Sequence, residues 1–127
     1  MTKRREMRVN VITYIYQYDL LDENMELDIE IENEDEKSLF LGCIEKRNEL
    51  FKIIEKNLVN YSLNRLSYID RAILLLATYE LKYTDTATNI IINEAVEITK
   101  IYSDLDDEKQ HKFNNKVIDS ISKDLRK

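Results

Sequence analysis

The sequence has no proline, no tryptophan and only one glycine among its 127 residues. Proline and glycine interrupt helices and mark turns, so their scarcity favours helices that are joined by short polar turns. A single glycine, Gly42, also excludes a glycine-rich phosphate-binding loop. The only cysteine, Cys43, cannot form an internal disulfide, and its apolar neighbours at helical spacing indicate a small buried side chain.

Catalytic and metal-binding constellations are missing as well. His111 is the only histidine and lies far from Cys43 in the sequence, so no nucleophile activated by a base is indicated. Zinc generally needs three or four nitrogen or sulfur ligands. We therefore expect neither an enzyme nor a cofactor. The longest apolar run, residues 72–77, is too short to cross a bilayer, and no signal-peptide pattern is present, so we expect a cytoplasmic protein.

Acidic residues outnumber basic ones by 25 to 19, but the acidity is concentrated in one stretch. Residues 22–36 hold nine carboxylates and no Lys or Arg, whereas the rest of the chain has 16 acidic and 19 basic residues. Apolar residues alternate with carboxylates in this stretch, which is strand periodicity, yet no second strand candidate exists to pair with it. We therefore interpret residues 22–36 as an extended, solvated connector.

The amino-terminal segment, residues 3–21, predicts an amphipathic helix. One apolar stripe of this helix is the expected core-facing side. It consists of Met7, Val11, Tyr14, Ile15 and Tyr18. Ile12 lies outside that stripe, on an arc that it shares with Arg5 and Tyr16.

Arginines gather on the same helix. At 100° per residue, Arg4, Arg5 and Arg8 fall within one 100° arc, and Tyr16 lies close to Arg5 in angle. Cations bind phosphates and aromatic rings stack on bases. An exposed strip of this composition therefore suits a single-stranded nucleic acid.

Further helices follow along the chain. Apolar spacing predicts a helix over about 35–59, with a possible break near Asn48, which suits an N-cap. Ser67 and Asp70 form a capping box ahead of a helix over about 68–82. This helix is apolar on most sides, so we expect it in the centre of a bundle.

Two more helices complete the chain, one over about 89–102 and one that starts at 104–107. The last one carries a lysine stripe within a 60° arc beside Phe113. Its members are Lys109, Lys112, Lys116, Lys123 and Lys127. Two interpretations of this lysine stripe stay open: a solvated face, partly paired with Asp119, or a second phosphate-binding strip.

Four motifs, in order, resemble the NusB family of bacterial transcription antitermination factors. They are the arginine-rich start that leads into Ile15-Tyr16-Gln17, and the segments 65–81, 92–100 and 112–119. The resemblance covers nearly the whole chain. It implies an all-α fold, a compact bundle of about six to seven helices in two small helical subdomains, as a single domain over residues 1–127.

The resemblance also implies a function. Members of this family bind boxA-type single-stranded RNA together with NusE, a small ribosomal subunit protein, within the transcription complex, and support ribosomal RNA transcription. A monomer or homodimer away from the membrane is expected. The RNA contacts implied are Arg4, Arg5, Arg8, Tyr16, Lys112, Phe113 and Asn115. Asp70, at the exposed start of the central helix, would face the protein partner.

Some positions depart from the family pattern, and some alternatives remain. Ala87 stands where a proline is usual, Lys116 replaces a glycine, and Glu6 interrupts the arginine cluster. A helical protein–protein adaptor with no RNA role of its own is the alternative function. The connector 22–36 is either a solubilising linker or a segment that folds back and competes with RNA for the first helix.

Overall fold

In the computed structural model, the described residues are 2–21, 30–104 and 108–126, and they contain helices and connecting segments but no β-strand. The elements follow in the order α1 (Lys3–Leu20), α2 (Glu34–Glu45), α3 (Arg47–Lys56), the 3-10 helix η1 (Leu63–Arg65), α4 (Tyr68–Tyr83), α5 (Thr88–Tyr102) and α6 (Lys109–Leu125). The all-α fold expected from the sequence is confirmed.

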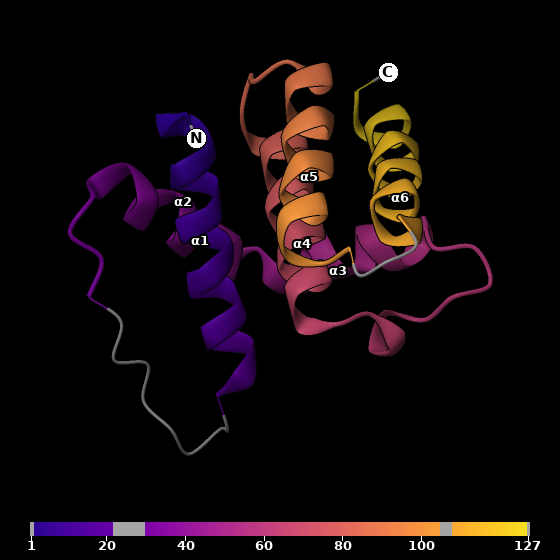
Figure 1. Cartoon of the computed structure of the whole chain (residues 1–127), viewed down its shortest axis with the longest axis horizontal. Coiled ribbons are helices and arrows are strands. Elements are labelled where there is room, and N and C mark those ends of the chain that lie inside the picture. The colour runs from indigo at the N-terminus through magenta and orange to yellow at the C-terminus, as the bar shows by residue number, and fades with distance from the viewer. Residues whose placement is uncertain (1, 22–29, 105–107, 127) are drawn as a thin grey trace.

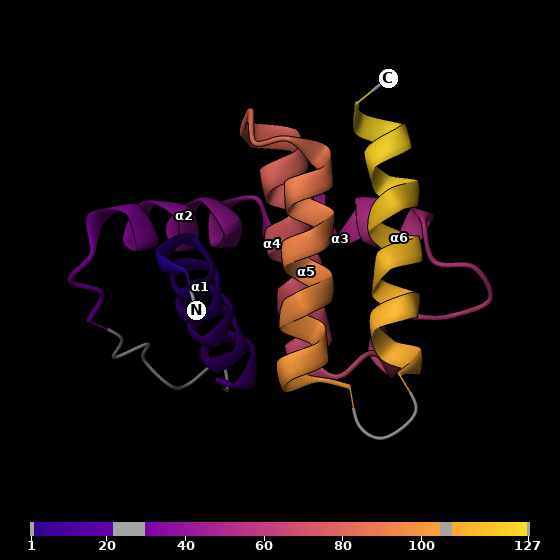
Figure 2. The ribbon, with the colours of Figure 1, turned by 45° about the horizontal axis from the view of Figure 1, so that its top comes forward.

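Helix α4 is the central element and packs against all five other α-helices. Figures 1 and 2 show α1 and α2 to one side of α4, α6 to the other side, and α5 in front of it. Residues 72–78 are buried without interruption, as the absence of a polar face predicts. The helix starts at the expected cap, because Ser67 Oγ accepts a hydrogen bond from the backbone N–H of Asp70 at 3.1 Å.

The buried face of α1 differs from the expected one. Val11 and Ile15 are fully buried as predicted, but Ile12 and Arg8, which lie outside the predicted stripe, are buried too. Glu80 of α4 pairs with Arg8 and thereby lets a charged side chain lie on the core side of the helix. The other residues of the predicted stripe are only half-buried: Met7, Tyr14 and Tyr18.

The predicted break in the second helical stretch is confirmed, but it lies at Lys46 rather than Asn48. Arg47 begins α3 and is held in place by its partners. Its guanidinium donates to Asp19 Oδ1 at 2.9 and 3.0 Å and lies 4.7 Å from the centre of the Phe51 ring.

Helices α2 and α4 approach each other closely at the single glycine. A Cβ atom on Gly42 would lie 2.3 Å from the hydroxyl oxygen of Tyr79, which is far inside van der Waals contact. The scarce glycine is therefore used where α2 packs against the Tyr79 side chain.

The carboxyl end of the acidic connector is helical. Residues 22–29, on which most of that prediction falls, lie outside the described residues. Asn33 caps α2 by accepting from the backbone N–H of Glu36 at 3.0 Å. The last three carboxylates, residues 34–36, thus occupy the first turn of α2, where the helix dipole favours negative charge. The prediction of an extended connector up to residue 36 is wrong at this end.

Helix α5 starts at Thr88, one residue before the expected position, whereas α6 starts later than the expected 104–107, of which residues 105–107 lie outside the described residues. Ile91, Ala95 and Ile98 form the buried side of α5. Helix α6 begins at Lys109, and Asp104 accepts a hydrogen bond from the backbone N–H of His111 at 2.9 Å, which satisfies one donor of the first turn. None of the helices in the described part of the chain combines the length and the apolar character that a membrane span requires.

Candidate nucleic-acid interface

The three arginines of α1 lie in three different environments. Arg4 is exposed and has no hydrogen-bond or ion-pair partner among the described residues. Arg5 donates from Nε to Glu94 of α5 at 2.6 Å and keeps 28% of its side chain exposed. Arg8 is only 5% exposed. Exposure of the arginine side chains therefore falls from Arg4 through Arg5 to Arg8, over little more than one helical turn.

Arg8 forms a two-point ion pair with Glu80, with Nε at 3.0 Å from Oε2 and Nη2 at 2.9 Å from Oε1. The prediction that Arg8 lies on an exposed strip is wrong. A carboxylate on the apolar helix α4 needs a buried cation, and Arg8 is the cation that α1 supplies. The remaining terminal nitrogen, Arg8 Nη1, is buried and has no partner among the described residues.

Tyr16 lies on α1 two turns beyond Arg8 and is half-buried. Its ring is neither part of the core nor fully exposed. A partly accessible ring of this kind still offers an edge or a face to a base.

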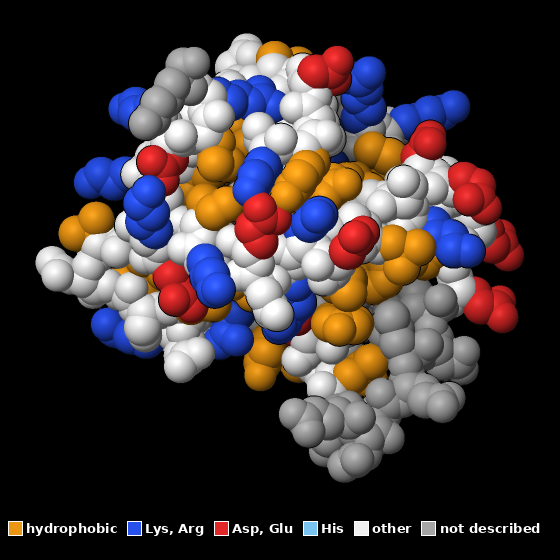
Figure 3. Space-filling model, turned by 180° about the vertical axis from the view of Figure 1, so that it is seen from behind, with side chains coloured by type: hydrophobic (Ala, Val, Ile, Leu, Met, Phe, Trp, Pro, Cys, Tyr) orange, Lys and Arg blue, Asp and Glu red, His pale blue; other side chains and the backbone are white. Residues whose placement is uncertain are grey.

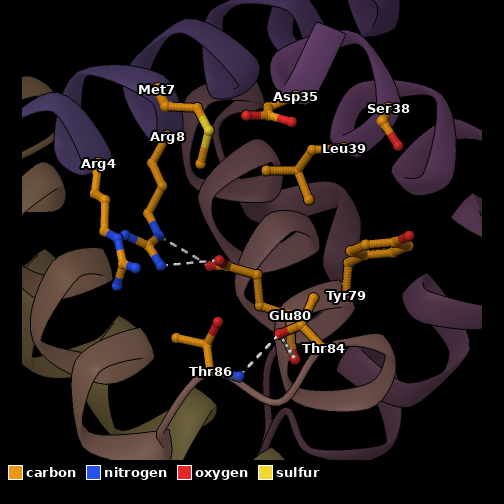
Figure 4. A pocket seen from close by; sticks show the side chains of 10 residues that line it. All are labelled: Arg4, Met7, Arg8, Asp35, Ser38, Leu39, Tyr79, Glu80, Thr84 and Thr86. Atoms are coloured by element: carbon orange, nitrogen blue, oxygen red, sulfur yellow. Dashed lines mark hydrogen bonds and ion pairs between the residues drawn. The ribbon is translucent and has the colours of Figure 1, made fainter.

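Arg4 and Arg8 line a groove of about 380 Å³ that α1, α2, the end of α4 and the α4–α5 turn enclose. Figure 4 shows its lining side chains, with the Arg8–Glu80 pair between Arg4 on one side and the Tyr79 ring on the other. The residues that line it are Arg4, Met7, Arg8, Asp35, Ser38, Leu39, Tyr79, Glu80, Thr84 and Thr86.

The candidates on α6 form a second surface. Lys112 and Asn115 are exposed. Phe113 is half-buried, and its ring packs against Tyr61 with the centroids 5.0 Å apart and the planes tilted by 54°. Phe113 also borders an open groove of about 510 Å³ beside Val59, which is 82% exposed. The exposed apolar side chains can stack on bases, and the neighbouring lysines can bind phosphates.

The structure does not bring these two surfaces together. Arg8 meets α4 at Glu80, near its carboxyl end, whereas Asn114 of α6 meets α4 at Asp70, near its amino end. Ten residues of helix separate those two points, which is about 15 Å along the axis. Figures 1 and 2 show α1 and α6 on opposite flanks of α4 and α5.

Asp70 is buried, with 4% exposure, so the prediction that it lies on an exposed helix start is wrong. Its carboxylate accepts hydrogen bonds from three side chains: Ser67 Oγ at 2.7 Å, Ser103 Oγ at 2.6 Å and Asn114 Nδ2 at 3.2 Å. These bonds join the start of α4 to the end of α5 and to α6. The carboxylate is buried because it satisfies donors from three elements.

The lysine stripe is exposed at each of its described positions, residues 109, 112, 116 and 123. Lys123 pairs with Asp119 at 3.0 Å on a well-exposed surface, and such pairs contribute little. Lys127 lies outside the described residues. Both interpretations of the stripe, solvated face and phosphate-binding strip, stay open.

No single large basic field covers the face shown in Figure 3. Lys and Arg side chains alternate there with Asp and Glu and with hydrophobic patches. Charges of both signs are therefore mixed on this face. Within the described ranges, no three His, Cys, Asp or Glu side chains are grouped so that they could hold a metal ion.

Two carboxylates determine which arginines of α1 are already paired, and the sequence pattern did not predict either pairing. Glu80 holds Arg8, and Glu94 holds Arg5. Glu80 could have been found, because it is the only acidic residue between Asp70 and Asp85 on an otherwise apolar helix. A carboxylate in such a position requires a partner.

Comparisons with known proteins agree on one family. The NusB family model matches residues 4–123. A transcription antitermination protein NusB of Listeria monocytogenes serotype 4a is 40% identical over 128 residues, covering 94% of this chain and 96% of that protein. The NusB structure of T. maritima superposes with a TM-score of 0.82 at 33% identity, covering 99% of this chain and 94% of that one.

A further solved structure contains the antitermination factors NusB and NusE in complex with double-stranded RNA. It superposes with a TM-score of 0.77 at 27% identity and covers 95% of this chain and 96% of that one. The relatives are named as transcription antitermination proteins, which are not enzymes, in agreement with the expectation from the sequence. Matches over nearly the full length in sequence and in structure show that the chain belongs to the NusB family.

Proposed function

We propose that this protein is a cytoplasmic transcription antitermination factor that binds boxA-type single-stranded RNA together with a NusE-like ribosomal protein and supports ribosomal RNA transcription. Family membership supports the antitermination role. The neighbouring complex of NusB, NusE and RNA supports the choice of partners, although its RNA is double-stranded. The single-strand preference rests on cations placed near aromatic rings on the same surface.

The observation that carries the proposal is the guanidinium of Arg4, which lies at a groove and has no partner among the described residues, next to the partly exposed Arg5. Both can bind phosphate without breaking a core contact. Arg8 does not take part in this way, because its charge is already used by Glu80, and its role is to fix α1 on α4. Tyr16 offers a ring further along the same helix.

Residues on α6 form a second RNA contact in this proposal. Lys112 supplies charge, Asn115 supplies hydrogen bonds, and Phe113 offers a ring already braced by Tyr61. Asp70 acts on the protein partner only indirectly, by holding Ser103 and Asn114 in place beneath the surface.

A filter-binding titration with boxA-type RNA, with and without the NusE-like protein, tests the proposal. We expect the wild-type protein to retain RNA, and Arg4→Ala and Arg5→Ala each to weaken retention several-fold through the loss of one phosphate contact. Lys52→Ala on α3 is the matched control, since Lys52 is an exposed cation that lines neither groove and should change little. RNA retained only with the partner present, and unaffected by the two arginine variants, would instead establish the adaptor function.

A further inference from the structure

The groove beside Arg4 contains chemistry that phosphate binding alone does not use. Its volume of about 380 Å³ lies in the range of small-molecule sites. One side carries the free Arg4 and the other carries the carboxylate of Asp35, in the first turn of α2. A groove with a cation and a carboxylate is matched to a ligand that has both a negative group and N–H donors.

Asp35 is available for such a ligand. It is exposed and has no hydrogen-bond or ion-pair partner among the described residues. Its neighbour Glu36 is buried and already accepts from Asn10 and Tyr14. Only one of these two consecutive carboxylates is therefore free, and it is the one that lines the groove.

The Arg8–Glu80 ion pair also lines the groove. Arg8 lines the groove, is 95% buried, and its Nη1 has no partner among the described residues. This nitrogen is itself buried, and Arg8 also lines a small apolar cavity between α1, α4 and α5, so the groove presents the Arg8–Glu80 pair to a ligand rather than a free donor. The Tyr79 ring and the hydroxyls of Ser38 and Thr86 complete the lining.

We propose that this groove holds one unpaired nucleotide of the RNA, with Arg4 on its phosphate and Asp35 accepting hydrogen bonds from its base, and that Asp35 thereby selects guanine. Guanine alone among the four RNA bases presents two adjacent donors, N1–H and the N2 amino group, on its Watson–Crick edge. A carboxylate accepts both of them side by side. The inference rests on the proposed RNA-binding function and adds a specificity-determining residue to it.

The test uses a uridine dodecamer with one central guanosine and the same RNA with inosine in its place. Inosine lacks only the N2 amino group. Binding is measured by fluorescence anisotropy on the full chain. We expect the wild-type protein to prefer guanosine over inosine by at least about tenfold, the effect of one hydrogen bond to a charged acceptor. In Asp35→Ala the two RNAs should bind equally well.

Glu34→Ala is the matched control, because Glu34 is an exposed carboxylate in the same turn of α2 and does not line the groove. It should keep the guanosine preference. If Asp35→Ala and Glu34→Ala instead raise the affinity for both RNAs by the same factor and leave the ratio unchanged, Asp35 only repels phosphate and the inference is overturned.

Two further results are informative. Failure of the wild-type protein to bind either RNA would overturn the inference alone, because boxA-type RNA with the NusE-like protein present tests the proposed function separately. An unchanged guanosine preference in Asp35→Ala, with weaker binding of tetra-arginine, would assign the groove to a cationic side chain of a protein partner and would overturn the inference alone.

Discussion

Arg8 and Glu80 are the residues on which the packing of α1 against α4 depends. Removing one member of a buried pair leaves the other charge without compensation. We expect Arg8→Ala to lower the free energy of unfolding by about 3–5 kcal/mol in urea denaturation. Arg4→Ala, an exposed and unpaired neighbour, should change it by less than about 0.5 kcal/mol.

The double variant Arg8→Met/Glu80→Leu separates charge from packing. Replacing both members of a buried pair by apolar residues is often close to neutral, so this variant should recover most of the lost stability. If Arg8→Ala proves as mild as Arg4→Ala, the pair is not the anchor that the geometry indicates.

Cys43 offers a probe of the core at the residue scale. Its side chain is fully buried, and burial, with the nearby negative charge of Glu80, raises the pKa of the thiol above its ordinary value. Only the thiolate reacts with a disulfide reagent. We therefore expect the native protein to react with Ellman's reagent only through unfolding, and the urea-unfolded protein to react at once. Rapid reaction in native buffer would show that α2 does not cover this site.

At the scale of elements, the residue that follows α6, Arg126, ties down the end of α4 and the turn between α4 and α5. Arg126 donates hydrogen bonds to five acceptors there: the carbonyl oxygens of Glu80, Leu81, Thr84 and Thr86, and the hydroxyl of Thr88. We expect Arg126→Ala to cost about 2–3 kcal/mol, as hydrogen bonds to a charged group do, and to speed amide exchange in residues 84–88. Lys123→Ala, which loses only an exposed pair with Asp119, should cost less than about 0.5 kcal/mol.

A second link between elements responds to pH. Burial acts to raise the pKa of Asp104, but hydrogen bonds from the side chain and backbone of His111 outweigh it and hold this pKa below its ordinary value. A lowered pKa stabilises the fold above the pKa of the unfolded state, and this contribution is lost as the pH falls. We expect Asp104→Asn to be less stable than the wild type at about pH 6, with the difference shrinking toward about pH 3. A difference that stays constant with pH would contradict this.

The helices show that local features can be predicted from the sequence, whereas contacts between distant positions cannot. The Ser67 cap and the apolar run of α4 are local, and both were predictable from a window of about 15 residues. The pairing of Arg8 with Glu80 spans 72 positions, so helical angles on α1 alone could not show which side faces the core. The prediction that Asp70 is exposed was wrong for the same reason, because its partners Ser103 and Asn114 come from the end of α5 and from α6.

For the whole molecule, a net charge of −6 must be reconciled with the proposed RNA binding. Nine of the carboxylates lie within residues 22–36, so overall charge says little about either groove. Exposed interactions beyond about 8–10 Å are largely screened at physiological salt. In the proposed function, RNA affinity therefore comes from a few cations on α1 and α6 that lie near aromatic rings, and Arg8 belongs to the scaffold.

The salt dependence of RNA binding tests this central claim most directly. Each phosphate neutralised on single-stranded RNA contributes about 0.7 to the slope of log affinity against log salt. Arg4→Ala should lower that slope by about 0.7, while Tyr16→Ala should weaken binding by about 1–3 kcal/mol without changing the slope. An unchanged slope in Arg4→Ala, or an equal loss of slope in Lys52→Ala, would contradict the assignment of this surface.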